Sequence, residues 1–294
     1  MRRDLHCIDL FGYSGKISKV WRSAGYSAEQ YDVLRGGRAH DILSKRGFLF
    51  LMRLGWKLVQ GGAIIGGPPC AMNIFLSSSV HQRQWFGPKG DVSNLRVRMS
   101  NLIAQNLATF LRLLTNEGRL FFVVLEQPKS SWFWQLEWIM ALGALLACIR
   151  INTWMAFFGH DLLKGTSLWG NLPQLSSMHR VLTRADKERF VRRLDSWIVP
   201  GHVVDVCFDD FGCFNQFSNV FYNFPDPFGL KHELERSTKE RRQAVRKRPR
   251  KYYEKNHTGR VHGCKDLAKT ADYPVAFARA LFRIWVNAFV QTPP

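Results

Sequence analysis

Residues 61–70 constrain the fold more than any other stretch, because glycines enclose an apolar run there and two prolines stop it. Residues 63–65 (Ala-Ile-Ile) are typical of a buried strand in a sheet covered on both faces. Pro68 and Pro69 fix the backbone and cannot donate to a ladder, so the chain must leave the sheet in a stiff turn. Cys70 is thereby expected at the carboxyl end of a strand, where open α/β sheets bind ligands. The alternative is a structural turn that ends in an inert cysteine.

The N-terminal segment predicts a strand, a glycine turn and a helix. Residues 6–11 are typical of a strand, residues 12–15 (Gly-Tyr-Ser-Gly) of a tight turn, and residues 16–24 of a short helix. Nucleotide-like cofactors are held by this arrangement, because amides at the helix N-terminus face the ligand. A second strand, residues 28–31, ends at Asp32, the position at which an acid commonly binds ribose hydroxyls.

Helices and strands continue to alternate further along the chain. Asp41 opens a predicted helix that runs to about residue 59, and it is either a ligand-binding acid or only the N-cap. Further predicted elements are a helix over 95–115, a strand over 120–125 that ends in Glu126-Gln127-Pro128, a helix over 132–147 and a strand near 151–157. This alternation predicts an α/β fold with a Rossmann-like, doubly wound, mostly parallel sheet.

Two segments lack a regular period. Residues 71–94 hold a run of three serines at 77–79, with His81, Arg83 and Trp85, and we expect a long mobile loop over the site. Beyond residue 159 the density of glycine, proline and aromatic residues rises, which predicts a small irregular C-terminal lobe. The expected domains are residues 1–160, an irregular basic lobe at 161–270, and a closing segment at 271–294 whose helix, residues 275–289, packs back on the first domain.

The charge predicts a polyanionic partner. The chain has 42 Lys and Arg against 23 Asp and Glu, a net charge of +19, which favours nucleic acid first and an acidic membrane surface second. The longest apolar stretch, residues 138–149, is shorter than the roughly 20 residues that span a bilayer, so no membrane segment is predicted. Residues 236–260 form a basic run that is either a solvated loop or a source of phosphate contacts. With Arg83, the candidate nucleic-acid contacts are Arg241, Arg242, Arg246, Lys247, Arg248, Arg250 and Lys251.

The cysteines indicate reduced thiols. Six cysteines show no C-x-x-C spacing and no signal peptide precedes them, so we expect an intracellular protein, nuclear if the host is eukaryotic. Cys207 and Cys213 lie near His202, but the spacing is too loose for zinc and favours a role in the core. No metal site is predicted.

Three motifs in this order resemble those of the DNA cytosine-5 methyltransferase family. Residues 9–15 (Asp-Leu-Phe-Gly-Tyr-Ser-Gly) resemble its cofactor motif, residues 67–70 (Gly-Pro-Pro-Cys) its nucleophile motif, and residues 125–128 (Leu-Glu-Gln-Pro) its glutamate motif. The resemblance covers roughly residues 5–160 and the last 25 residues, and its motifs are moderately specific when taken together.

The resemblance implies S-adenosyl-L-methionine as cofactor, DNA as substrate and base flipping into the site, with RNA not excluded. Cys70 would be the nucleophile at carbon 6 of cytosine and Glu126 the acid at N3. The cofactor-binding residues that it implies are Asp9, Phe11, Gly12, Gly15, Asp32, Asp41 and Pro69.

Some positions depart from the family pattern. Tyr13 replaces the central glycine of the cofactor motif, and Ala71 replaces the glutamine that usually follows the cysteine. Residues 164–166 (Lys-Gly-Thr) occupy the region where the family has Gln-x-Arg-x-Arg. These differences favour an alternative interpretation, a catalytically inactive methyltransferase-like protein that binds nucleic acid.

Overall fold

The computed structural model describes residues 2–74, 77–160, 163–195, 253–255, 261–263 and 272–292. The chain divides into two compact units. The first consists of Met1–Val181 and Asp272–Pro294, and the second of Leu182–Ala271. The first unit therefore runs past residue 160, where the sequence pattern placed the end of the first domain.

The first unit is built on a six-stranded mixed sheet with the strand order β2-β1-β3-β4-β6-β5. Its strands are β1 (Leu5–Leu10), β2 (Ala28–Tyr31), β3 (Leu58–Gly66), β4 (Phe121–Pro128), β5 (Ile149–Trp154) and β6 (Gly165–Gly170). The first four are mutually parallel, and β6 is antiparallel to both β4 and β5. The α/β class and the mostly parallel sheet are as expected, but the order is not that of the Rossmann fold.

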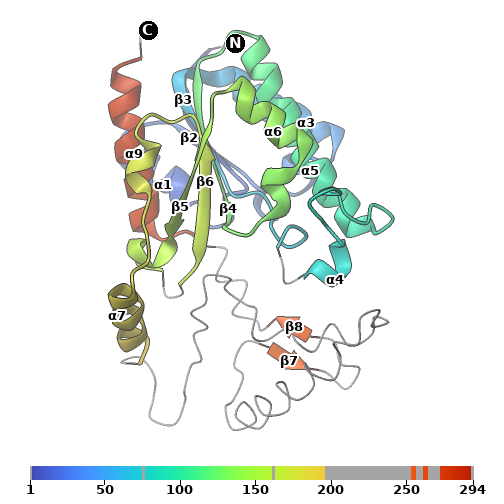
Figure 1. Ribbon diagram of the computed structural model, residues 1–294. Coiled ribbons are helices and arrows are strands. Elements are labelled where there is room, and N and C mark those ends of the chain that lie inside the picture. Colours follow the sequence, from blue (N-terminus) through green and yellow to red (C-terminus); the bar gives the residue numbers. More distant parts are fainter. Residues whose placement is uncertain are drawn as a thin grey trace, which may run out of the picture. The chain divides into compact units, whose positions relative to one another are not determined.

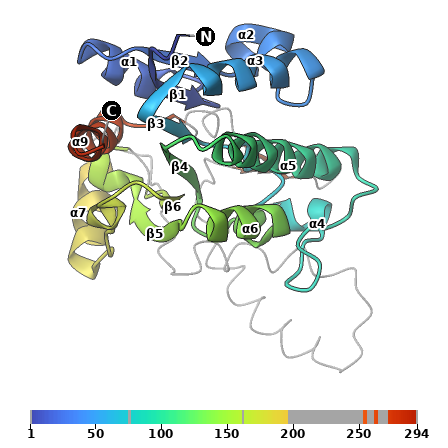
Figure 2. The same ribbon diagram turned by 90° about the horizontal axis from the view of Figure 1, so that it is seen from above.

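Helices cover both faces of this sheet (Figures 1 and 2). On one face lie α1 (Lys16–Ser23) and α9 (Val275–Val290), which pack on each other and on the strands. On the other face lie α3 (Lys45–Lys57), α5 (Leu95–Asn116) and α6 (Glu137–Leu145). Shorter helices are α2 (Val33–Gly36), α4 (Ser78–His81) and the 3-10 helices η1 (Gly37–His40), η3 (Trp132–Gln135), η4 (Met155–Phe158) and η5 (Leu175–Met178).

In the second unit, the described elements are α7 (Arg184–Asp195) and the antiparallel pair of β7 (Tyr253–Lys255) and β8 (Val261–Gly263). The basic run at 236–260 lies outside the described residues except for the backbone of β7. The candidate contacts Arg241, Arg242, Arg246, Lys247, Arg248, Arg250 and Lys251 are all outside them, as are His202, Cys207 and Cys213.

Strand alternation decides which side chains face which helical layer. On β4, Val124 packs toward α1 and α9, whereas Val123 and Leu125 pack toward α3, α5 and α6. The same alternation carries Glu126 to the α9 side and Gln127 to the opposite side.

The helix expected to open at Asp41 begins four residues later. Its N-cap is Ser44, whose hydroxyl oxygen accepts a hydrogen bond from the Gly47 amide at 2.9 Å. Asp41 instead accepts from the Leu43 amide at 3.0 Å in a local turn. A hydroxyl three residues before a glycine amide satisfies one of the free donors of the first turn, so Ser44 replaces Asp41 as the cap.

Three further elements differ from the sequence prediction. The loop at 71–94 contains a short helix, α4, and the helix predicted over 132–147 is divided into η3 and α6. The division falls at Leu136, whose backbone is extended, and the Ser131 hydroxyl caps the start of η3 at the Phe133 amide. β6 was missed altogether and lies inside the region expected to be an irregular lobe.

Candidate functional site

Two turns lie at the carboxyl ends of neighbouring strands in the middle of the sheet. The first follows β1 and the second follows β3, and β1 lies between β2 and β3. The chain moves outward in opposite directions from this point, to β2 on one side and to β3 and β4 on the other. In open α/β sheets such a switch point is the usual place for a ligand.

The first turn is shaped by Asp9, which is 1% exposed. Its Oδ2 accepts a hydrogen bond from the Ser18 amide at 2.9 Å, so the carboxylate caps the first turn of α1. Burial raises the pKa of Asp9 to about 6, against the effect of the Ser18 hydrogen bond. A Cβ on Gly12 would lie 1.9 Å from Asp9 Oδ1, and Gly15 has a φ of +65° at the N-cap. Both glycines are therefore required by the fold itself.

Neighbouring residues hold the same turn from outside. Phe11 adopts a φ of 57°, unusual for a residue with a side chain, and its amide donates to the Tyr31 carbonyl at 2.7 Å. The Gln30 side-chain amide donates to the carbonyls of Gly12 at 2.5 Å and Tyr13 at 3.2 Å. The Tyr13 side chain is half exposed, so its ring is not packed into the turn.

The two other acids implied as cofactor ligands make local contacts. Asp32 is 6% exposed and caps α2, where its Oδ1 accepts from the Leu34 amide at 2.7 Å. Asp41 accepts from the Leu43 amide and is half-buried. Each carboxylate thus has a structural partner within two residues.

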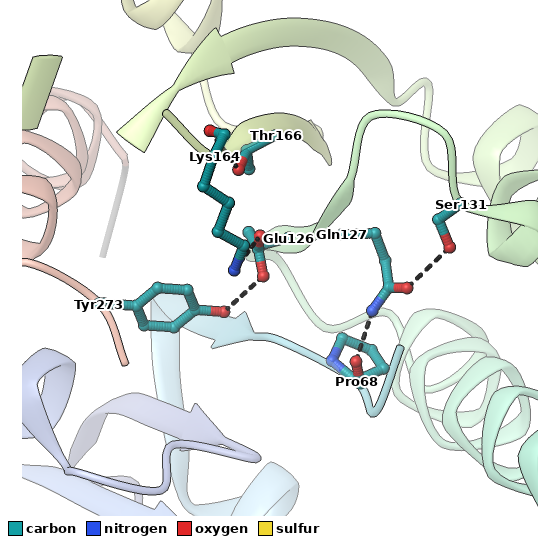
Figure 3. A network of polar contacts seen from close by, with 7 residues as sticks. All are labelled: Pro68, Glu126, Gln127, Ser131, Lys164, Thr166 and Tyr273. Carbon is teal, nitrogen blue, oxygen red and sulfur yellow. Dashed lines mark hydrogen bonds and ion pairs between the residues drawn. The ribbon is translucent and has the colours of Figure 1, made fainter. Parts of the chain in front are cut away.

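The second turn is fixed by a buried glutamine from β4. Gln127 donates from Nε2 to the Pro68 carbonyl, and its Oε1 accepts from the Ser131 hydroxyl at 2.8 Å (Figure 3). Gln127 is fully buried. A proline-containing turn has few amide donors of its own, so this side chain determines where the turn sits.

Glu126 is held on both sides by distant parts of the chain. Its Oε2 accepts from the Tyr273 hydroxyl at 3.2 Å, and its Oε1 lies 3.2 Å from Lys164 Nζ (Figure 3). The Glu126 side chain is 8% exposed and the Lys164 side chain 18%. A Cβ on Gly67 would lie 2.1 Å from the Tyr273 hydroxyl oxygen, so a glycine is needed beneath the ring.

Cys70 belongs to the same cluster. Burial raises the pKa of Cys70, the Glu126 charge raises it further, and Lys164 has the opposite effect. Burial also raises the pKa of Tyr273, and so do the charges of Glu126, Asp9 and Cys70. The Glu126 charge thus raises the pKa of both Cys70, which follows β3, and Tyr273, which precedes α9.

Three of these residues were not predicted as site residues: Gln127, Lys164 and Tyr273. Tyr273 is 147 positions from Glu126, and no local pattern indicates their contact. The preceding residue, Asp272, is ion-paired to Lys16 at 2.5 Å between Asp272 Oδ2 and Lys16 Nζ. The segment before α9 thus connects the start of α1 to the catalytic candidate Glu126.

Arg83, expected to contact nucleic acid, is 5% exposed. Its Nε donates to the Met72 carbonyl at 2.8 Å, and its Nη1 donates to Asn101 Oδ1 at 2.9 Å and to the Pro88 carbonyl. The guanidinium is directed into the loop, where it joins three separate segments.

Within the residues that the structure describes, no three His, Cys, Asp or Glu side chains are grouped so as to hold a metal ion. None of the helices in that part of the chain is long and apolar enough to cross a membrane. In comparisons with known proteins, the chain matches no protein-family model, and no curated protein is significantly similar to it in sequence.

Proposed function

We propose that this protein is an S-adenosyl-L-methionine-dependent methyltransferase that acts on carbon 5 of cytosine in DNA. The observation that carries the proposal is the placement of Cys70 and Glu126 at the carboxyl ends of adjacent parallel strands. Cys70 follows β3 and Glu126 lies near the carboxyl end of the neighbouring parallel strand β4, and the Glu126 charge raises the pKa of Cys70. A nucleophile and an acid beside a switch point are what this reaction needs.

The chemistry follows from the weakness of carbon 5 as a nucleophile. Cys70 Sγ forms a bond to carbon 6, which moves electron density to carbon 5 and N3. Glu126, carrying a proton, donates a hydrogen bond to N3 and so stabilises the negative charge that develops there. After carbon 5 gains the methyl group, a base removes the hydrogen that carbon 5 still carries. The electrons of that C–H bond restore the double bond between carbons 5 and 6, and the carbon–sulfur bond breaks. Cys70 is released as a thiolate.

The first turn is the proposed cofactor site. S-Adenosyl-L-methionine, when bound, supplies the electrophilic methyl group. Among the described residues, Asp9 Oδ1 is buried without a hydrogen-bond partner, as an acceptor awaiting a donor would be. The residues that would hold the cofactor are Asp9, Phe11, Gly12, Gly15, Asp32, Asp41 and Pro69.

The charge of the first unit supports a nucleic-acid substrate. Residues 1–181 and 272–294 contain 23 Lys and Arg against 11 Asp and Glu, a net +12. The larger share of the +19 therefore lies in the unit that contains Cys70, independently of the basic run.

One observation favours the alternative, a methyltransferase-like protein that binds nucleic acid without catalysis. Both carboxylate oxygens of Glu126 already face partners, Tyr273 and Lys164, and burial raises the pKa of Cys70. In the enzyme, the Tyr273 contact has to give way to the base.

Transfer of an isotopically labelled methyl group to DNA and RNA oligonucleotides tests the proposal. Wild type should label cytosine-containing DNA, and digestion should release 5-methylcytosine. Cys70→Ala should abolish labelling, whereas Cys148→Ala should not, because Cys148 lies away from the cluster and burial raises its pKa to about 12. DNA binding without transfer by the wild type would favour the binding-only alternative, and labelling of RNA alone would correct the substrate.

A further inference from the structure

Two adjacent aromatic residues project from the loop that follows Cys70. Trp85 is 77% exposed and Phe86 is 88% exposed, the highest values among the large hydrophobic residues in the described part of the chain. They form the tip of a tight turn closed by hydrogen bonds in both directions between Gln84 and Gly87, at 3.3 and 3.0 Å. Two neighbouring aromatics exposed to this degree mark a contact surface.

The turn is held by a buried polar core. Arg83 bonds to Met72, Pro88 and Asn101, as described above. His81 Nδ1 accepts from the Arg83 amide at 2.9 Å, and the His81 carbonyl accepts from the Asp91 amide at 2.8 Å. The loop therefore displays its aromatic tip on a braced base and does not fold it inward.

The same bracing leads to Cys70. Arg83 Nε donates to the Met72 carbonyl, two residues from the cysteine. The Asn73 amide donates to the Cys70 carbonyl at 2.8 Å, and the Asn73 side chain donates to the Pro69 carbonyl at 3.3 Å. Hydrogen bonds therefore run from Arg83, beside the tip, to the turn that contains Cys70.

Exposed cations follow the tip in the sequence. Arg83 is buried in the loop and Lys89 is paired with Glu137, at 2.8 Å between Nζ and Oε1, whereas Arg96 and Arg98 are exposed at the start of α5. Exposed aromatic side chains in a unit that also exposes arginines suit single-stranded or opened nucleic acid, in which bases stack on the rings and phosphates meet the cations.

We propose that Trp85 and Phe86 form a base-stacking wedge that contacts the nucleobases of the substrate beside Cys70. The location next to a reacting base rests on the proposed function, but the stacking does not, since it requires only nucleic-acid binding. The wedge adds a contact that is not electrostatic to the phosphate contacts made by the basic residues.

Fluorescence anisotropy of the full chain with labelled oligonucleotides tests the wedge. The probes are single-stranded DNA and a deoxyribose–phosphate chain of the same length without bases. Trp85→Ala should weaken DNA binding about tenfold, and Trp85→Tyr should restore it. Neither should alter binding of the abasic chain or the slope of affinity against salt. Trp56→Ala is the matched control, because Trp56 is 41% exposed at the far end of α3 and should change nothing.

Equal losses on DNA and on the abasic chain, or no loss at all, would overturn the wedge. The wedge would also be overturned if Trp85→Ala lost binding to phosphatidylserine vesicles but kept its affinity for DNA. That result would assign the tip to a membrane surface. Base-dependent binding without methyl transfer would contradict the proposed function and leave the wedge standing. If Trp85→Ala keeps both methyl transfer and normal DNA affinity, the wedge would be contradicted and the proposed function would stand.

Discussion

The two turns at the carboxyl edge of the sheet are built in different ways. The turn after β1 is supported by residues nearby in sequence: Asp9 caps α1 at Ser18, and Gln30 donates to Gly12. The turn after β3 is supported from far along the chain. Gln127 reaches Pro68 from 59 positions away, and Tyr273 reaches Glu126 from 147 positions away.

The two turns therefore depend on different parts of the chain. A local turn can form a binding surface as soon as its strand and helix exist. The second turn exists in its present form only when β4, the Lys164 loop and the segment before α9 have assembled. The side chains proposed to take part in the reaction are therefore the ones whose positions depend most on the completed fold.

Gly67→Ala should be the most damaging of the small substitutions in the second turn. Its Cβ would lie 2.1 Å from the Tyr273 hydroxyl oxygen, so we expect a loss of about 3 kcal/mol in the free energy of unfolding. Tyr273→Phe in the same chain should recover part of it, because the clashing oxygen is gone. Urea unfolding measures both, with Gly87→Ala as control, since no atom lies within 4 Å of that Cβ. Equal stability of Gly67→Ala and Gly87→Ala would show that the second turn is not closely packed.

Asp9→Asn should change the pH dependence of stability. Because burial raises the pKa of Asp9 from 3.8 to about 6, the folded state binds more protons than the unfolded state between these values. Wild-type stability should fall as pH rises through that window, by about 3 kcal/mol from this residue. The stability of Asp9→Asn should not fall in this way. Its free energy of unfolding, relative to that of the wild type, should therefore rise by this amount between about pH 4 and 7. Parallel profiles for the two proteins would contradict the burial of a charged Asp9.

A matched pair of substitutions compares the turns directly. Gln127→Met removes the donor to the buried Pro68 carbonyl and should lower the free energy of unfolding by about 2 kcal/mol. Gln30→Met removes the donor to the Gly12 carbonyl, a hydrogen bond that is only partly buried, and should lower it by about 1 kcal/mol or less. Thermal or urea unfolding of both variants measures the difference. A larger loss for Gln30→Met would reverse the comparison between the turns.

The smallest effect concerns the thiol. Since the Glu126 charge raises the pKa of Cys70 and Lys164 acts oppositely, Glu126→Gln should lower this pKa and Lys164→Met should raise it. Iodoacetamide labelling of Cys70 across pH, located by peptide mass mapping, should show faster reaction for the first variant and slower for the second. Cys148 serves as the internal reference. Unchanged rates in both variants would remove Cys70 from the cluster.

The sequence predicted the parts of this fold that have local signals. Apolar runs stopped by prolines identified β3 and β4, and a glycine turn between a strand and a helix identified the start of the chain. β6 was missed because residues 165–170 (Gly-Thr-Ser-Leu-Trp-Gly) have no strand pattern of their own, and its hydrogen bonds to β4 and β5 form the strand. Tyr273 and Lys164 were not predicted as site residues for the same reason, since only the folded chain brings them to Glu126.

The most direct measurement is a covalent trap with DNA that contains 5-fluorocytosine. Fluorine at carbon 5 blocks the final elimination, so a protein that attacks carbon 6 stays bound there and migrates as a larger species in a denaturing gel. With cofactor present, wild type should form this adduct, Cys70→Ala should not, and Glu126→Gln should form it about 10²-fold more slowly. An adduct in Cys70→Ala, or none with the wild type on any cytosine substrate, would contradict a cysteine-based methyltransferase.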